Sequence, residues 1–160
     1  NGKYDKSWWC HHYTLSTWNN CFYIDVIAES ILCVALNIYF EARSEDLRGK
    51  VAVGSVVMNR VESPSFPDTA CDVIYQAEYV GKWPKRHRCQ FSWFCDGLLD
   101  IPREPEEWAQ AITVATWIYS IGLADITNGA LWYHSNDVSP RWATTDYTQI
   151  GSHKFYKEVK

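Results

Sequence analysis

Two apolar series with helical spacing lie close together in the chain, and a polar stretch separates them. The first recurs every three or four residues, as the buried face of a helix does, and comprises Ile27, Ile31, Val34 and Ile38. Asp25 can cap the start of this helix, and the pattern breaks between Glu41 and Ser44. We therefore expect a helix that is buried on one side and ends next to Glu41.

The second series has the same spacing and comprises Leu47, Val51, Ser55, Met58 and Val61. Its valine-rich centre would also suit a strand, but its length and its period favour a helix. Pro64 and Pro67 would end this helix, because proline cannot donate the backbone hydrogen bond that a helix interior requires. Two neighbouring helices are therefore expected before residue 64.

Shorter elements are expected in the middle of the chain. Asp68 or Thr69 can cap a short helical piece that runs to Tyr75. Loops are expected from there to Asp100.

The last third of the chain predicts one more helix and a small sheet. Pro105 suits the first turn of a helix and Gly122 its end, with an inward face formed by Trp108, Ile112, Ala115 and Tyr119. After the turn signal at 128–129, short strands are expected at 130–134 and 154–156. The expected fold class is α+β, mainly helical with a small β-sheet.

The size and charge of the chain exclude several classes. With 160 residues it can form one domain with its own core, and no apolar run approaches the roughly 18 residues that cross a bilayer. Its net charge is −4 with acids and bases mixed, which argues against nucleic acid as a partner. Only residues 82–88 are locally basic, and we expect a solvated loop there, with contact to an anionic polymer as the less favoured alternative. Nine Trp and ten Tyr are many, and any exposed ones would suit stacking on sugar rings.

The cysteines favour disulfides over metal binding. The six, without C-x-x-C pairs, are Cys10, Cys21, Cys33, Cys71, Cys89 and Cys95. Spacing leaves the pairing open: the last three lie in a turn-rich section that a bridge would tie together, and the first two could close the N-terminal segment. Cys33, on its helix, is expected to be simply buried. Disulfides indicate a periplasmic or extracellular location.

Glu41 is the candidate catalytic residue. It follows Tyr39 and Phe40 where a buried helix gives way to a polar loop, so its carboxyl group could stand at the wall of a cleft, partly removed from water. Such a site raises a carboxyl pKa and keeps the proton in place for general acid catalysis. Glu45, four residues on, would repel the charged form, and Arg43 could moderate that effect. By residue type alone, however, a glutamate at a helix end is usually a solvated surface residue.

A set of short strings in a fixed order changes that assessment. They are EARSE at 41–45, GKVAVG at 49–54, MNRV at 58–61, SFPDT at 65–69, VIYQ at 73–76, CQFS at 89–92, CDG at 95–97, GAL at 129–131 and IGSHKFY at 150–156. Over about residues 31–156, the chain resembles the SleB/CwlJ-like cell wall hydrolases. Ser44 departs from the glycine usual at that position, which would strain a loop that needed positive φ. Residues 78–88 look like an insert that extends the substrate groove or covers the surface.

The resemblance implies a lysozyme-like fold with a small sheet beside the active-site cleft. It also implies cleavage of peptidoglycan between N-acetylmuramic acid and N-acetylglucosamine, with Glu41 as the catalytic acid. Members of this family look like lytic transglycosylases, which need one carboxyl group and form an anhydro sugar. A hydrolytic muramidase would use a second carboxylate, for which Asp96 and then Glu45 are the candidates. We favour the single-acid mechanism.

Further residues are candidates for substrate binding. They are Gln90, Ser92, Asp96, Tyr133, His134 and Trp142. Asp96 could instead serve the turn at Gly97, and Trp142 could be a core residue. Tyr133 and His134 alternate on a strand, so only one should face the cleft. His153 is expected to be structural.

Rival functions are less well supported. A zinc amidase would draw on His11, His12, His134 and His153, which lack ligand spacing. A Cys–His peptidase would use Cys33 or Cys89, neither of which lies in a nucleophile motif. A non-catalytic cell-wall-binding or phage structural module is the more serious alternative, although the presence of Glu41 argues against it. We expect no metal and no cofactor.

The N-terminal segment lies outside the resemblance. Residues 1–23 are expected to form an aromatic, cysteine-containing extension, and residues 24–160 the catalytic domain. The chain opens at Asn1 and shows no signal peptide, so we expect a processed product or a piece of a longer chain, such as one in a phage particle. Its location should be extracytoplasmic, whether periplasmic, secreted or virion-associated.

Overall fold

The computed structural model describes residues 18–159, with side chains described from residue 26 onward. The helices are α1 (Trp18–Ala42), α2 (Leu47–Glu62), α3 (Ala70–Ile74) and α4 (Pro105–Ile121), with a 3-10 helix at Ser92–Cys95. The strands are β1 (Ala77–Val80), β2 (Trp83–Cys89), β3 (Trp132–Ser135), β4 (Thr148–Ile150) and β5 (His153–Tyr156). This confirms the expected α+β class. Among the described residues, no helix combines the length and apolar character needed to cross a membrane.

The helix ends largely follow the sequence signals. Asp46 caps α2, accepting a hydrogen bond from the Gly49 backbone N–H at 2.8 Å, and Thr69 caps α3. The left-handed Gly122 ends α4 as predicted. The predicted cap at Asp25 was wrong, because α1 begins at Trp18 and continues through that position. It also crosses the expected boundary at residue 24, and residues 1–17 lie outside the described part.

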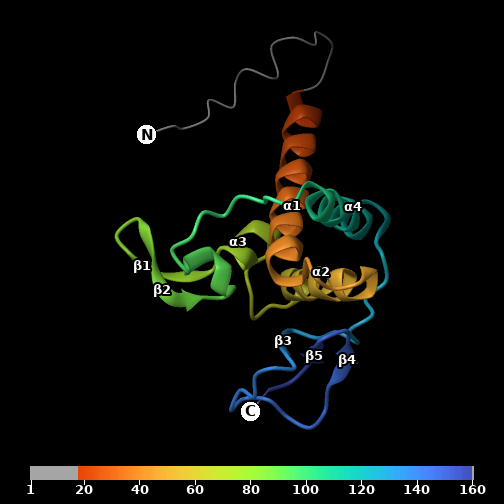
Figure 1. The fold of residues 1–160 in the computed structure, drawn as a ribbon. Helices are drawn as coiled ribbons and strands as arrows, with labels where there is room; N and C mark the ends of the chain where they lie inside the picture. The colour runs from red at the N-terminus through yellow and green to blue at the C-terminus, as the bar shows by residue number, and fades with distance from the viewer. Residues whose placement is uncertain (1–17, 160) are drawn as a thin grey trace.

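The core lies between α1, α2 and α4. Val34, Ala35 and Ile38 on α1 are completely buried, as is Ala115 on α4. Gly54 lets the three helices approach closely, since a Cβ at that position would lie 3.1 Å from the Ile38 side chain. A fully buried Val or Ile side chain contributes about 1.5–3 kcal/mol to folding, so Val34 and Ile38 fix the end of α1 firmly. Figure 1 shows α4 beside α1, with α2 running beneath them.

A three-stranded antiparallel sheet lies on the other side of α2. Its order is β3-β5-β4, and in its register Tyr133 lies opposite Phe155. Phe155 and Ile150 are buried together with Val53 and Val56 of α2. The two predicted strands are confirmed, whereas β4 was not foreseen.

The segment expected to be loops contains a second, two-stranded sheet. Strands β1 and β2 form an antiparallel hairpin within it, so that prediction was wrong. The hairpin projects from one side of the helices (Figure 1). Its residues are mostly exposed.

Two disulfides join described cysteines. One links Cys33 to Cys71 and ties α1 to α3, and the other links Cys89 to Cys95 at the base of the hairpin. Cys33 is buried, but the expectation that it is simply buried was wrong, because it is bonded to Cys71. Cys10 and the side chain of Cys21 lie outside the described part.

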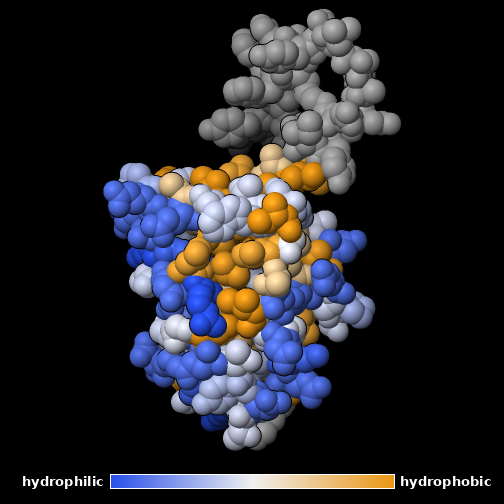
Figure 2. All heavy atoms as spheres, turned by 90° about the vertical axis from the view of Figure 1, so that its right-hand side faces the viewer, coloured by the Kyte–Doolittle hydropathy of each residue, from blue (hydrophilic) through white to orange (hydrophobic). Residues whose placement is uncertain are grey.

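On the face drawn in Figure 2, the surface differs between the two halves of the molecule. Figure 2 shows apolar side chains gathered on the helical half and mainly polar side chains on the half that carries the three-stranded sheet. Exposed apolar residues on α1 and α4 include Val26, Leu32, Trp117 and Ile121.

Candidate active site

Glu41 lies in the last turn of α1, at the wall of an open cavity between the helices and the three-stranded sheet. The cavity has a volume of about 300 Å³. It is lined by Glu41, Arg60, Gln90, Phe91, Ser92, Trp132, Tyr133 and Trp142. These residues come from α1, α2, β3 and the segments after β2 and β3, so the site exists only in the folded chain.

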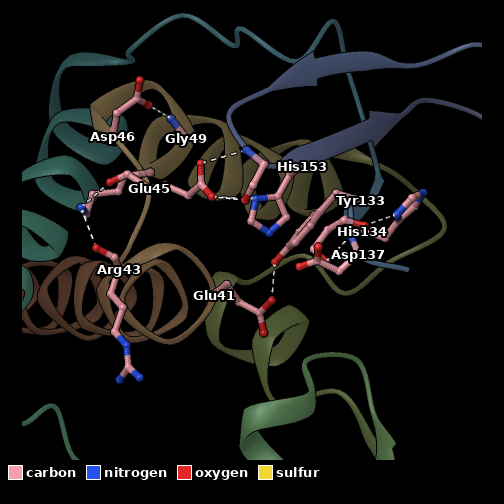
Figure 3. A network of polar contacts seen from close by, with 12 residues as sticks. Glu41, Arg43, Glu45, Asp46, Gly49, Tyr133, His134, Asp137 and His153 are labelled. Atoms are coloured by element: carbon pink, nitrogen blue, oxygen red, sulfur yellow. Dashed lines mark hydrogen bonds and ion pairs between the residues drawn. The ribbon is translucent and has the colours of Figure 1, made fainter. Parts of the chain in front are cut away.

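Burial raises the pKa of the Glu41 carboxyl above its ordinary value of 4.5. The hydrogen bond from Tyr133 and the charge of Arg60 act against this rise without cancelling it. The expected influences of Glu45 and Arg43 are not among the causes, and Arg43 points away from Glu41 (Figure 3). Loss of water contact therefore favours the protonated form of Glu41.

Tyr133 is the direct partner of Glu41. Its hydroxyl donates a hydrogen bond to Glu41 Oε2 at 3.1 Å, as Figure 3 shows. Burial and the neighbouring carboxylate raise the pKa of Tyr133 well above its ordinary value, so the phenol keeps its proton and remains a donor. Asn37, one turn before Glu41 on α1, is completely buried. Its side chain lowers the pKa of the Tyr133 phenol and so partly offsets the rise.

Arg60 is a buried cation in the floor of the cavity. Burial lowers the pKa of its guanidinium to about 10, which leaves it charged at neutral pH. Its Nε donates to the Leu131 carbonyl at 2.7 Å, just before β3, and the guanidinium lies against the rings of Phe66 and Phe91. With its amide suitably oriented, the Gln90 carbonyl accepts from both terminal nitrogens of Arg60, at 3.1 and 3.2 Å.

The loop between α1 and α2 is held by Lys50. Its ammonium group is buried and donates to the carbonyls of Arg43 at 3.1 Å and Glu45 at 2.8 Å. Its Nζ also lies 3.0 Å from a carboxylate oxygen of Glu107 on α4. The residues that follow Glu41 are thus fixed from both neighbouring helices. Ser44 does not adopt positive φ, so the strain considered for a serine at this position is absent.

The carboxylate of Glu45 is bound to the turn between β4 and β5. It accepts hydrogen bonds from the Ser152 hydroxyl and from the Ser152 backbone N–H, the latter at 3.2 Å. One of its oxygens lies 3.6 Å from His153 Nδ1. Figure 3 shows this group beside Tyr133, whose ring contacts His153 edge-on. Glu45 therefore joins the loop after Glu41 to the sheet that carries Tyr133.

The structure brings most of the predicted site residues to one cavity. Gln90, Ser92, Tyr133 and Trp142 line it together with Glu41. Trp142 also packs edge-on against His134 and Tyr156. It therefore lines the cavity and also packs against neighbouring rings, as the two expectations for it required.

Three predicted residues are placed elsewhere. His134 is buried on the other face of β3, where Nε2 lies 2.8 Å from the Tyr156 hydroxyl, as the strand alternation required. Asp96 accepts a hydrogen bond from the Leu98 backbone N–H at 2.7 Å and serves the turn. Glu45 faces Ser152, and neither it nor Asp96 lines the cavity.

Sequence reasoning missed Arg60, Phe91 and Trp132 in this cavity. The available signal was the position of Arg60 within an otherwise apolar helix face. A buried arginine requires polar partners, and these must come from other parts of the chain.

The structure also describes some of the residues that a Cys–His peptidase or a zinc amidase would use. Cys33 and Cys89 are in disulfides and are not thiols. In the described part of the chain, no group of three or more histidine, cysteine or acidic residues could hold a metal ion. His11 and His12 lie outside that part.

Known proteins similar to this chain include curated cell-wall enzymes. The chain is 30% identical over 131 residues to a spore cortex-lytic enzyme of Bacillus cereus, and 31% identical over 130 residues to one of Oceanobacillus iheyensis. Each alignment covers 79% of this chain but 44% and 41% of the relatives, so the chain spans less than half the length of these curated relatives.

Solved structures show a related fold. The catalytic domain of the germination-specific lytic transglycosylase SleB from Bacillus anthracis superposes with a TM-score of 0.57 at 29% identity. The superposition covers 79% of this chain and 92% of that domain. The Bacillus cereus SleB catalytic domain, at 24% identity and a TM-score of 0.52, supports the fold alone.

The family model for cell wall hydrolases matches residues 44–156, so Glu41 lies just before the matched range. Since that range is well over half of the 160 residues, the chain belongs to the cell wall hydrolase family.

Proposed function

We propose that this chain cleaves the glycan strands of peptidoglycan between N-acetylmuramic acid and N-acetylglucosamine, as a lytic transglycosylase. The observation that carries the proposal is Glu41, whose carboxyl group stands at the wall of an open cavity with its pKa raised by burial. The related SleB domain is named as a lytic transglycosylase, which supports the same reaction here.

Glu41 acts first as an acid and then as a base. It gives its proton to the glycosidic oxygen as the bond from muramoyl C1 to that oxygen breaks. The resulting carboxylate takes the proton of the muramoyl C6 hydroxyl, whose oxygen bonds to C1 and closes the anhydro ring. No water is consumed, and Glu41 ends protonated as it began. Tyr133 and Arg60 stabilise the carboxylate between the two proton transfers.

The cavity supports the one-carboxylate route over hydrolysis. Glu41 is the only acidic residue among the described residues that line it. Hydrolytic glycosidases normally place two carboxylates about 5 to 9.5 Å apart across the bond. Glu45 and Asp96, the two candidates, are instead bonded to Ser152 and Leu98.

The remaining lining residues form the sugar site. The indoles of Trp132 and Trp142 offer faces for the apolar sides of sugar rings, while Gln90 and Ser92 offer polar groups for hydroxyl and N-acetyl groups. Residues 24–160 serve as the catalytic domain in this proposal. Its substrate lies outside the cytoplasm, so the domain acts there, and the disulfides suit that location.

Digestion of purified peptidoglycan tests the proposal. The wild-type chain should release muropeptides with anhydro ends, which are lighter by one water than the reducing ends of a muramidase product. The Glu41→Gln variant should release neither. Reducing ends would overturn the transglycosylase assignment. Inactivity of both proteins would favour a binding module, and free stem peptides with intact glycan would favour an amidase.

The stability of the Glu41→Gln variant serves as a control for its folding. Because burial raises the pKa of Glu41, its ionisation costs stability once the pH rises above 4.5, the ordinary value. Glu41→Gln should therefore be at least as stable as wild type at pH 7, and the difference should disappear below pH 4.5. An inactive variant that is also unfolded would say nothing about catalysis.

A further inference from the structure

The β1–β2 hairpin contains a wide bulge made of basic residues. Ala77 pairs with Cys89 and Tyr79 with Pro84, so Glu78 alone on β1 lies opposite four residues on β2. These four, Lys85, Arg86, His87 and Arg88, form what we term the basic bulge. All are exposed, and His87 has a positive φ of 59°. A bulge redirects side chains away from the regular alternation of a strand.

The base of the hairpin is fixed next to the candidate active site. The Gln90 backbone N–H donates to the Gln76 carbonyl at 2.8 Å, directly beyond the last strand pair. The Cys89–Cys95 disulfide ties the end of β2 to the 3-10 helix. Gln90 and Ser92, which lie between the two cysteines, line the cavity of Glu41.

An open hollow of about 510 Å³ lies along the bulge. His87 and Arg88 line it on one side, with Glu78 and Gln76 opposite. Gln90 lines both this hollow and the cavity of Glu41, so the two are neighbours along one surface. A polymer that extended from Glu41 past Gln90 would therefore reach the basic bulge.

The hairpin carries positive charge that its own residues do not neutralise. Four cationic side chains against the single carboxylate of Glu78 leave residues 77–89 with a net charge of +3, whereas the whole chain has −4. Glu78 lies 3.4 Å from Lys85 and 4.0 Å from Arg88. Within the described part of the chain, Lys82 and Arg86 make no ion pair.

We propose that the basic bulge binds the free carboxylates of the stem peptides that branch from the glycan strand. This inference rests on the proposed function, because it takes the strand at Glu41 to be peptidoglycan. The glycan backbone offers hydroxyl and amide groups to the cavity, and the stem peptides carry the negative charge. Exposed guanidinium groups beside the cavity complement that charge, and Arg can bind a carboxylate with two parallel hydrogen bonds.

Binding of the Glu41→Gln variant to soluble glycan strands tests this without cleavage. Strands that keep their stem peptides are compared with strands from which an amidase has removed them. The Glu41→Gln chain should prefer the peptide-bearing strands. Adding Arg86→Glu and Arg88→Glu should weaken binding of those strands by roughly fivefold to tenfold at low salt, because two rim charges are reversed. The loss should be confined to the peptide-bearing strands.

A matched variant controls for overall charge. Arg48→Glu with Lys157→Glu makes the same change in net charge at two exposed positions that line neither the cavity nor the hollow. An equal loss in this control would overturn the proposal, as would an equal loss of binding to denuded strands. Unchanged binding after amidation of the peptide carboxylates would also overturn it. Tighter binding of a phosphate-bearing wall polymer would assign the bulge to that ligand instead.

The outcomes separate this inference from the proposed function. Preference for peptide-bearing strands by a chain whose wild type cuts nothing would leave the bulge assignment intact and remove the catalytic one. Anhydro products without any such preference would do the reverse.

Discussion

The two antiparallel sheets of this molecule are held in place in different ways. The β3-β5-β4 sheet buries Phe155 and Ile150 against α2, and it brings Tyr133 to Glu41. The β1–β2 hairpin leaves Trp83 78% exposed and is secured at its base by a disulfide and a backbone hydrogen bond. The first sheet therefore belongs to the folding core, while the second is an attached arm.

This difference separates stability from recognition within one small domain. A residue of the three-stranded sheet contributes to the folding free energy and to the geometry around Glu41 together, so changes there should affect both. A residue at the tip of the hairpin makes few internal contacts, so a change there should leave folding intact. Substitutions in the two sheets measure how far this separation holds.

The largest effect is expected from Phe155→Ala. The side chain is 1% exposed and packs against Tyr133 as well as α2, so truncation leaves a cavity beside the candidate active site. Stability should fall by about 3–5 kcal/mol, measured by urea unfolding. A loss below about 1 kcal/mol would show that the sheet is not part of the core.

The next effect is expected from Glu45→Ala. It removes the acceptor of the two Ser152 hydrogen bonds that tie the β4–β5 turn to the loop after Glu41. Stability should fall by about 1–2 kcal/mol, because two hydrogen bonds to a charged carboxylate are lost at a solvent-accessible turn. Cleavage should fall as well, since β5 pairs with the strand of Tyr133. Glu62→Ala, at an exposed carboxylate on α2, is the matched control and should change neither.

The sequence predicted the parts of the fold that depend on local signals. Caps and apolar periods located α2, α3 and α4 and the end of α1, and a turn signal located β3. The hairpin was missed because its strands bury no face: Lys85, Arg86 and Arg88 are exposed, and alternation is visible only where one face packs on a core. The start of α1 was missed because Asp25 was interpreted as a cap, whereas the helix runs through this position from Trp18.

The candidate site was predictable to a more limited extent. Glu41 was found through a resemblance, and Tyr133 through strand alternation after a turn. The partners of Glu45 lie more than a hundred positions away at Ser152, which no local pattern could indicate. Likewise, Arg60 is identified by its contact with the carbonyl of Leu131, which only the tertiary structure reveals.

A smaller effect on stability, but a clear one on pH dependence, is expected from Tyr133→Phe. The hydroxyl lowers the pKa of Glu41, so its loss leaves the opposing effect of burial stronger and raises that pKa further. Cleavage that needs protonated Glu41 should then persist to higher pH, while its maximum falls roughly tenfold because the carboxylate loses a hydrogen bond. Stability should change by no more than about 1 kcal/mol.

This effect is measured as the rate of cleavage across a range of pH. Tyr147→Phe, at an exposed tyrosine, is the control. A descending limb that moves to lower pH would contradict the described role of the hydroxyl. If activity declines over the same pH range as in wild type, the Tyr133 hydroxyl does not influence the ionisation of Glu41, and Tyr133 is only a packing residue of the sheet.

The smallest effect is expected from Trp83→Ala at the start of β2. Its indole is 78% exposed, whereas Trp93, in the core beside Phe40, is 6% exposed. Trp83→Ala should change the free energy of unfolding by less than about 0.5 kcal/mol, and Trp93→Ala should lower it by about 3–5 kcal/mol. Urea unfolding of both variants measures the contrast on one residue type. A loss above about 1 kcal/mol for Trp83→Ala would mean that the arm packs on the domain and is not held by its base alone.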